Sequence, residues 1–147
     1  MADTIGSLCD KLSIVKIKID KLSQVQEKSN ELNEKINNLF GQQHKLELEL
    51  IGEINGTDQA SSQVYVELQQ HIYKINLELF ETQDIVRDKE NMADQSFNEK
   101  RLKLYDHIVA LNNQRSALMN KINKLFGDRT EDIKTYKFTG KQHGDVS

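Results

Sequence analysis

The fold of this chain is decided by residues 96–127, which read SFNEKRLKLYDHIVALNNQRSALMNKINKLFG. Apolar side chains recur there in alternating steps of three and four residues, and arginine takes two of the places. The row consists of Phe97, Arg101, Leu104, Ile108, Leu111, Arg115, Leu118, Ile122 and Leu125. This spacing predicts one helix of about 30 residues, roughly 45 Å long, with a left-handed, coiled-coil-like packing face. Such a rod must bury its face against other helices, a second copy of the chain, or both.

The two ends of this helix have sequence signals of their own. Ser96 and Glu99 have the spacing of a capping box, in which both side chains accept hydrogen bonds from backbone N–H groups of the first turn. Gly127 predicts the other end, because glycine readily adopts the left-handed conformation that closes helices. We therefore expect the helix to begin near Phe97 and to end at Gly127.

Two earlier apolar rows predict helices in the first third of the chain. The first row is Ile5, Leu8, Leu12, Val15, Ile19 and Leu22. The second row is Val25, Leu32, Ile36, Leu39, Leu46 and Leu50. Asp3 or Thr4 can cap the first helix, and the change of phase between the rows predicts either local overwinding or a short break near Ser23. Gly41 predicts either a kink or a helix end followed by a short second helix.

A further helix is predicted from about residue 62 to residue 90. Its apolar row is Tyr65, Leu68, Ile72, Ile75, Leu79 and Val86, with Thr82 as a polar interruption. The connections at 55–62 and 91–95 are short, so neighbouring helices should run antiparallel. The sequence therefore predicts an all-α fold, an antiparallel bundle of three or four long helices over residues 1–127. Residues 128–147 are predicted to form an irregular tail, in which residues 133–139 alternate like a short strand.

Composition narrows the class of protein. Charged residues make up 29% of the 147-residue chain and nearly cancel to a net charge of −3, whereas nucleic-acid binders carry a basic patch or stripe. Cys9 is the only cysteine, so no intramolecular disulfide can form and a reducing compartment is expected. The first residues do not read as a signal peptide, and no apolar run approaches the roughly 20 residues needed to span a bilayer. We therefore expect a cytoplasmic protein with no nucleic-acid or membrane partner.

Carboxylates three residues apart on a helix offer one route to metal chemistry. Glu31 and Glu34 form one such pair, and Glu78, Glu81 and Asp84 form a later acidic row. Side chains at this spacing share a face and can hold Mg²⁺ through oxygen ligands. The pattern is similar to that of all-α nucleotide pyrophosphohydrolases of the MazG type, in which metal-activated water attacks a phosphate. The gap from Glu34 to Glu81 is much longer than in that family. We therefore expect a solvated helix face and no cofactor, with Mg²⁺ only under this alternative.

Other catalytic signatures are missing from the sequence. The four histidines share no helical spacing with one another, whereas a zinc site needs several converging nitrogen or sulfur ligands. They are His44, His71, His107 and His143. No glycine-rich loop follows a predicted strand, and no pairing of a nucleophile with a base is visible. The sequence therefore does not favour an enzyme.

Arg115 is a charged residue within the apolar row of the best-defined helix, with Asn112 one turn before it. A buried guanidinium without a partner costs several kcal/mol, so Arg115 must meet a carboxylate, a bound anion or water. The candidate carboxylates are Asp10, Glu81 and Asp84. The structural interpretation is a polar layer that fixes the packing register of the helices, or an arginine that reaches out to solvent along its methylene groups. The other is a binding site for a phosphate or carboxylate, which the fork of an arginine suits. The structural interpretation is favoured.

Residues in three segments of the chain carry a resemblance to a known family. The first two segments contribute Ile5-Gly6, residues 10–14, Ile17-Lys18, Asn76, Leu79-Phe80, Asp84, Val86-Arg87 and Glu90. The third, where the likeness is closest, contributes Asn112, Arg115, Leu118, Ile122-Asn123, Gly127 and residues 134–136. These residues resemble a family of small bacterial and phage proteins known only as a domain of unknown function, sometimes encoded near glycosyltransferases. The resemblance covers about half of the chain, and it implies an all-helical fold in a bacterium or an infected host.

The resemblance also points to a set of polar positions on three different helices. If these positions bind a ligand, the site comprises Asp10, Lys11, Asp84, Arg87, Asn112 and Arg115. The chain departs from the family at Gln83 and Asn113, where acids are expected, and at Ser7, where a glutamate would complete a capping box. Because these acidic residues are missing, the resemblance gives little support to catalysis by carboxyl groups at this site.

Three classes of function fit the sequence. The favoured class is a non-enzymatic, self-associating helical-bundle protein with a structural or interaction role, whose main partner is a second copy of itself. A phage origin is one option for this class. The alternative is a binder of, or enzyme on, a phosphorylated small molecule or nucleotide whose identity the sequence does not give. A Mg²⁺-dependent nucleotide phosphohydrolase is the third and least favoured class.

Overall fold

The computed structural model describes residues 3–54 and 62–128. The described chain contains four long helices: α1 (Ile5–Ser23), α2 (Asn30–Ile54), α3 (Gln63–Arg87) and α5 (Asn98–Leu125). A short helix α4 (Lys89–Ala93) and a 3-10 turn (Gln95–Phe97) connect α3 to α5. The predicted all-α bundle is confirmed. The strand predicted at 133–139 and most of the loop predicted at 55–62 lie outside the described residues.

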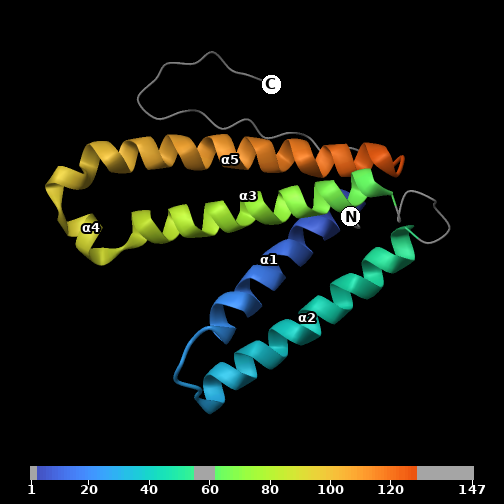
Figure 1. The fold of residues 1–147 in the computed structure, drawn as a ribbon, viewed down its shortest axis with the longest axis horizontal. Coiled ribbons are helices and arrows are strands. Elements are labelled where there is room, and N and C mark those ends of the chain that lie inside the picture. The colour runs from blue at the N-terminus through green and yellow to red at the C-terminus, as the bar shows by residue number, and fades with distance from the viewer. Residues whose placement is uncertain (1–2, 55–61, 129–147) are drawn as a thin grey trace.

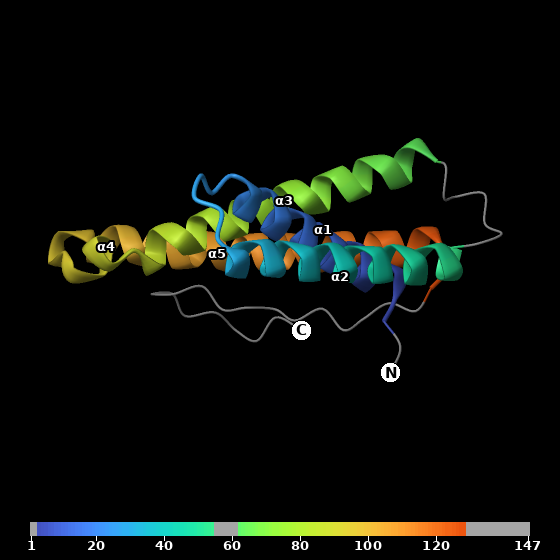
Figure 2. The same ribbon diagram turned by 90° about the horizontal axis from the view of Figure 1, so that it is seen from below.

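The four long helices form two antiparallel hairpins (Figures 1 and 2). The α1–α2 hairpin diverges from the α3–α5 hairpin, and the two come together at the end where α1 begins and α5 ends. Helix α1 packs against α2, α3 and α5, and it lies between α2 and the second hairpin. Helix α2 is therefore placed at one edge of the molecule, whereas α1 occupies its centre.

Two clusters of buried apolar side chains hold the helices together. The first joins all four long helices and consists of Ile5, Leu8, Cys9, Leu12, Leu50, Tyr65 and Ile122. The second lies between α3 and α5 and consists of Ile72, Ile75, Leu79, Leu111 and Leu118. Burial of each leucine or isoleucine of this kind stabilises the fold by about 1.5–3 kcal/mol. The predicted rows of α3 and α5 supply most of these residues, which confirms their orientation.

Helix α1 begins with its first turn held by the end of α5. Thr4 is the N-cap and accepts a hydrogen bond from the third residue of the helix through its hydroxyl group. The backbone N–H of Ile5 donates to the Asp128 carboxylate over 2.8 Å, and that of Gly6 donates to Asn123 Oδ1 over 2.6 Å. These bonds satisfy donors that a helix start leaves without an intrahelical partner. The start of α1 is therefore fixed by tertiary contacts as well as by its own cap.

Gly6 allows α1 and α5 to approach each other closely. A Cβ atom at this position would lie 2.1 Å from the Met119 carbonyl oxygen and 2.8 Å from Asn123 Oδ1. Both distances are shorter than van der Waals contact, and the first involves backbone that cannot rotate away. The close packing of the two helices therefore requires glycine here.

The two ends of α5 show one confirmed and one wrong prediction. Gly127 has a φ of 66°, and the N–H of Asp128 donates to the Asn123 carbonyl over 2.8 Å, which completes a Schellman motif. The predicted capping box is wrong, because the N-cap of α5 is Phe97 and makes no side-chain bond. Ser96 instead donates to Asp94 through both its N–H and its hydroxyl. The aspartate thereby stabilises the preceding 3-10 turn and leaves Ser96 outside the helix.

The α1–α2 hairpin settles the two alternatives left open near Ser23 and Gly41. Helix α1 ends at Ser23 and α2 begins at Asn30, so the phase change marks a break. Of the two alternatives predicted at Gly41, a kink or a helix end, the helix end is wrong, because α2 continues through this residue to Ile54. One glycine costs a helix only about 1 kcal/mol, which the neighbouring helical turns outweigh. The connection predicted at 91–95 likewise contains helical residues of α4.

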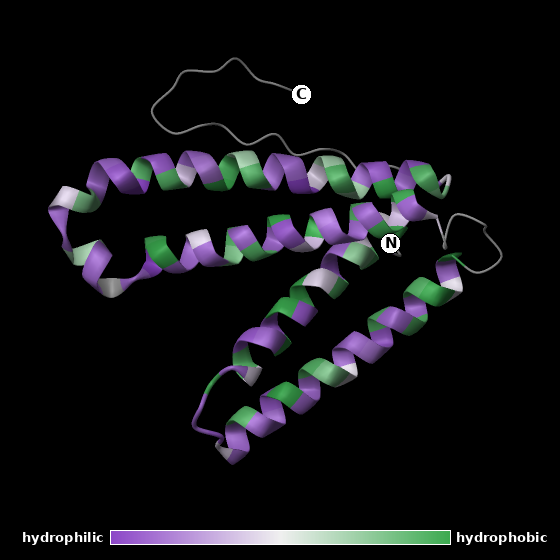
Figure 3. Ribbon diagram, viewed as in Figure 1, coloured by the Kyte–Doolittle hydropathy of each residue, from purple (hydrophilic) through white to green (hydrophobic). Residues whose placement is uncertain are grey.

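Apolar and polar residues alternate along every long helix (Figure 3). Among the described helices, none is both long and apolar enough to cross a membrane. The alternation matches an amphipathic bundle, in which each helix turns one face inward.

Candidate functional site

Asp10 and Arg115 form an ion pair that links α1 to α5. Arg115 donates from Nε to one carboxylate oxygen over 2.7 Å and from one terminal nitrogen to the other oxygen over 2.5 Å. The Asp10 side chain is only 4% exposed, whereas that of Arg115 is 31% exposed. The guanidinium therefore reaches into the bundle from its margin and neutralises a buried carboxylate with the bidentate geometry that arginine favours. Of the three partners expected for Arg115, Asp10 is the one observed.

Two further polar side chains complete this buried network. The Asn76 amide nitrogen on α3 donates to Asp10 Oδ1 over 2.8 Å and to the Ser13 hydroxyl over 2.7 Å. Ser13 in turn donates to the Asp10 backbone carbonyl over 2.7 Å. The network therefore joins α1, α3 and α5 at one level of the bundle, and satisfied buried groups of this kind fix helix register. This arrangement is the polar layer, one of the two forms of the structural interpretation favoured from the sequence.

The other residues of the predicted ligand site do not gather around this pair. Lys11 is exposed on α1, and its Nζ lies 2.8 Å from an Asp3 carboxylate oxygen. Asn112 is half-buried one turn before Arg115 on α5. Asp84 and Arg87 are exposed near the end of α3, about 12 and 16 Å along the helix axis from Asn76. The structure therefore brings Asp10 and Arg115 together and leaves Asp84 and Arg87 far from them.

The acidic row that could hold Mg²⁺, Glu78, Glu81 and Asp84, does not converge on one point, because its members contact different neighbours. Glu78 lies 2.8 Å from His107 Nε2 on α5, whereas Glu81 lies 3.4 Å from Lys21 Nζ on α1. Glu78, Glu81 and Asp84 are all exposed. Within residues 3–54 and 62–128, no three histidine, cysteine or acidic side chains cluster closely enough to hold a metal ion.

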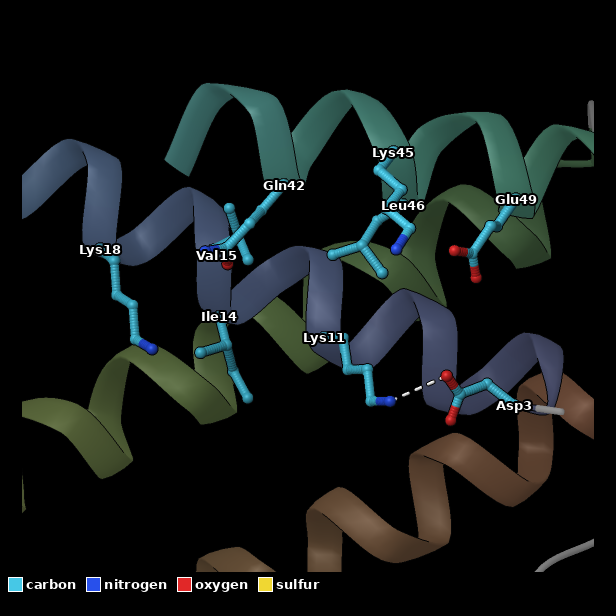
Figure 4. Close-up of a pocket in the computed structure, with 9 residues that line it drawn as sticks. All are labelled: Asp3, Lys11, Ile14, Val15, Lys18, Gln42, Lys45, Leu46 and Glu49. Atoms are coloured by element: carbon cyan, nitrogen blue, oxygen red, sulfur yellow. Dashed lines mark hydrogen bonds and ion pairs between the residues drawn. The ribbon is translucent and has the colours of Figure 1, made fainter. Parts of the chain in front are cut away.

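A groove with a volume of about 420 Å³ lies between α1 and α2 (Figure 4). Its apolar lining is Ile14, Val15 and Leu46, and its polar lining is Asp3, Lys11, Lys18, Gln42, Lys45 and Glu49. Figure 4 shows the Lys11 side chain directed along the groove toward Asp3. The groove therefore combines an apolar base with three ammonium groups and two carboxylates, a surface that suits a small amphiphilic anion.

Helix α2 exposes a second apolar row, which lies beside the row predicted from the sequence. Phe40, Leu48 and Ile51 are 51%, 55% and 60% exposed. With exposed His44 between them, they occupy about 80° of the helix circumference at 100° per residue. We call Phe40, His44, Leu48 and Ile51 the outer face of α2. The row predicted from the sequence is instead half-buried, apart from exposed Val25 and buried Leu50.

Cys9 is a packed thiol in the first core cluster. Its side chain is buried, and Sγ lies 3.5 Å from the Tyr65 hydroxyl, which accepts a 3.0 Å hydrogen bond from Gln69. Burial raises the pKa of the Cys9 thiol above its ordinary value, and burial also raises the pKa of Tyr65. A thiol that resists ionisation is a poor nucleophile, so Cys9 serves the core rather than chemistry.

Comparison with known proteins finds no matching family model, curated protein or solved structure. A function for this chain must therefore be inferred from its own geometry. That geometry offers a saturated polar network in the core, a lysine-lined groove, and the outer face of α2.

Proposed function

We propose that the chain is a non-enzymatic, self-associating helical-bundle protein, and that copies meet through the outer face of α2. The observation that carries this proposal is the imbalance within α2. The helix has 25 residues and buries only Leu50, while Phe40, Leu48 and Ile51 are each more than half exposed. Helices in proteins gain most of their stability from packing of an apolar face. A second copy would supply the packing that α2 lacks within its own chain.

The buried polar network supports a structural role over a catalytic one. Both carboxylate oxygens of Asp10 accept hydrogen bonds from Arg115, and one also accepts from Asn76. A general acid or base must instead reach a substrate with its reacting oxygen. The polar groups that a reaction would use are therefore already bonded to one another within the network. These bonds hold α1, α3 and α5 in register.

The expected association is weak to moderate. Covering the exposed part of three side chains of this size contributes about 1 kcal/mol each, so six such side chains in a two-fold contact contribute at most about 6 kcal/mol, and the loss of translational and rotational freedom on association reduces this value. A dissociation constant of 1 μM corresponds to about 8 kcal/mol and 1 mM to about 4 kcal/mol. Self-association should therefore be sought from about 10 μM to several hundred micromolar.

Sedimentation equilibrium over this concentration range tests the proposal. The wild-type chain should show a reversible increase in mass, and Leu48→Asp should abolish it because a buried charge opposes the contact. Gln42→Asp is the matched control, since it adds the same charge on another side of the same exposed helix and should associate normally. A wild-type chain that stays monomeric at every concentration contradicts the proposal.

The α1–α2 groove supports a second candidate function, the binding of a small phosphorylated molecule. Lys11 and Lys18 on α1 and Lys45 on α2 line it above the apolar side chains of Ile14 and Leu46. Bound ligand in excess must raise the melting temperature. Nucleotides and inorganic phosphate, with and without Mg²⁺, should therefore raise it in the wild-type chain and not in a Lys18→Gln, Lys45→Gln variant. No shift with any of these compounds rejects this second function.

A further inference from the structure

The residues along the two sides of the outer face of α2 are complementary to those of a second α2 in one relative orientation. We infer that two copies pair through α2 side by side, parallel and in register, about a two-fold axis that runs along the helix pair. This inference rests on the proposed self-association and specifies its geometry. Three observations support it: the positions of Gly41 and Gly52, the order of side chains around α2, and the charged residues that flank the outer face.

Gly41 and Gly52 face open space among the residues that the structure describes. A Cβ atom at either position would meet nothing within 4 Å, although each glycine costs the helix about 1 kcal/mol relative to alanine. Each directly follows a large exposed apolar residue, in the pairs Phe40-Gly41 and Ile51-Gly52. The two pairs are eleven residues apart, which is close to three helical turns, so they lie on one side of α2. Glycines on such a face let another helix approach closely.

The order of residues around α2 puts the large side chains and the glycines on opposite borders of the face. At 100° per residue and measured from Phe40, Ile51 lies at about 20° and His44 at about 40°. Leu48 lies at about 80°, and Gly41 and Gly52 lie at about 100° and 120°. Phe40 and Ile51 therefore form one border and the two glycines the other, with His44 and Leu48 between them.

This arrangement distinguishes parallel from antiparallel pairing. In a parallel two-fold pair, the two opposite borders of the face meet, so Phe40 and Ile51 of each copy lie against Gly41 and Gly52 of the other. In an antiparallel two-fold pair, like borders meet, which places glycine against glycine and large residue against large residue. Only the parallel pair fills the space above the glycines, and a contact between identical surfaces must be self-complementary in this way.

Charges beyond the two borders favour the same orientation. Glu47, which is half-buried and accepts a hydrogen bond from Gln43, lies next to the border of large residues at about −20° from Phe40. Lys45, which also lines the α1–α2 groove, lies next to the glycine border at about 140°. Parallel pairing places Lys45 of each copy beside Glu47 of the other, about 3 Å apart along the axis. Antiparallel pairing instead brings the two Lys45 side chains together, and like charges in contact disfavour the complex. The position of α2 at the edge of the molecule leaves the rest of each copy outside the pair (Figure 1).

Cysteine cross-linking tests the orientation. Asn37 is exposed at about 60°, the middle of the face, so Asn37→Cys should form a disulfide-linked dimer in high yield under mild oxidation when the pair is parallel. An antiparallel pair centred on the same face separates the two positions by about 27 Å along the axis, and no disulfide forms. Two controls should remain uncross-linked: the wild-type chain, whose Cys9 is buried, and Lys35→Cys on a different side of α2.

The outcomes separate the orientation from the proposed function. A wild-type monomer overturns both. Reversible association that Leu48→Asp abolishes, together with no cross-link from Asn37→Cys, overturns the parallel pair and leaves self-association standing. Gly41→Leu gives a second readout on a folded chain, because it should weaken dimerisation at least tenfold while helix content is retained. Unchanged affinity in Gly41→Leu also contradicts the inferred pairing.

Discussion

Helices α1 and α2 belong to one hairpin and both contain regular apolar rows, yet their surroundings are opposite. Helix α1 buries eleven of its nineteen residues, including the polar residues Ser7, Asp10 and Ser13. Helix α2 buries one residue of twenty-five. The difference arises because α1 packs against three helices, whereas the main neighbour of α2 is α1. Apolar periodicity therefore identifies a helix and its packing face, but the number of neighbours decides how much of that helix is core.

Glycines in the two helices also differ in what surrounds them. Gly6 in α1 lies against the backbone of α5, and Gly41 and Gly52 in α2 have open space where a side chain would be. The first supports packing within the chain. The other two lie beside exposed apolar residues and fit packing between chains. Substitutions at these positions are the sharpest way to test the contrast between the two helices.

The largest effect is expected for Gly6→Ala. The added methyl group would collide with the Met119 carbonyl and with Asn123, so α1 must move away from α5. We expect a loss of about 3 kcal/mol in the free energy of unfolding, the upper part of the range for overpacked sites. Urea denaturation measures it. Stability equal to that of the wild-type chain would show that α1 and α5 do not approach this closely.

A somewhat smaller loss is expected for Arg115→Met, which leaves Asp10 buried with Asn76 as its remaining side-chain donor. Removing one partner of a buried pair costs about 3–5 kcal/mol, and partial exposure of Arg115 reduces the expected loss to about 2–3 kcal/mol. Arg87→Met on exposed α3 surface is the control and should change stability by less than about 0.5 kcal/mol. Equal effects of the two substitutions would contradict the role of the network. Adding Asp10→Asn to Arg115→Met should restore part of the stability.

A pH-dependent effect is expected from Cys9 in the core of α1. Burial raises the pKa of the folded thiol above that of the unfolded chain, which is about 8.5. The unfolded state therefore loses its proton first, so the stability contributed by the neutral thiol is complete below about pH 8.5 and declines as the pH rises toward the folded pKa. Melting temperatures between pH 7 and 9.5 should fall more steeply for the wild-type chain than for Cys9→Ala. Parallel curves would contradict burial of the thiol.

The smallest effect is expected for Gly41→Ala, and its sign is opposite. The new methyl group enters open space on an exposed helix, so the free energy of unfolding of the monomer should rise by about 0.5–1 kcal/mol. The same substitution should weaken self-association, because it fills the space that Phe40 of the other copy would occupy. Urea denaturation of dilute protein and sedimentation of concentrated protein measure the two effects separately. Destabilisation of the dilute monomer would show that Gly41 has a packing role within the chain.

Much of the fold could be predicted because burial imposes a period on the sequence. The rows of α3 and α5 identified core positions such as Ile72 and Ile122, and Gly127 identified the end of α5. The N-terminal cap of α5 was harder to predict, because a competing local hydrogen bond decides it. Asp94 binds Ser96 and removes it from the predicted capping box. At Gly41 the neighbouring helical turns likewise outweigh the cost of one glycine, so α2 continues through it.

The polar residues were only partly predictable. A buried arginine must find a charge, so a carboxylate partner for Arg115 followed from energetics. Which carboxylate Arg115 contacts depends on the heights along α1, α3 and α5 at which these helices pack against one another. Asp84 lies too far along α3 from the network to reach Arg115. Ser13 was missed because a serine on a helix has no sequence signal of a buried role. The outer face of α2 was missed because Leu48 and Ile51 merge with the neighbouring half-buried row in a linear reading.

Hydrogen–deuterium exchange of the wild-type chain, measured at about 5 μM and at several hundred micromolar, tests the central claim most directly. If a second copy covers the outer face of α2, amides of residues 40–52 should exchange more slowly at the higher concentration, while amides of α1 near Asp10 should exchange at the same rate. Exchange in residues 40–52 that does not depend on concentration would contradict the claim that α2 completes its packing with another chain.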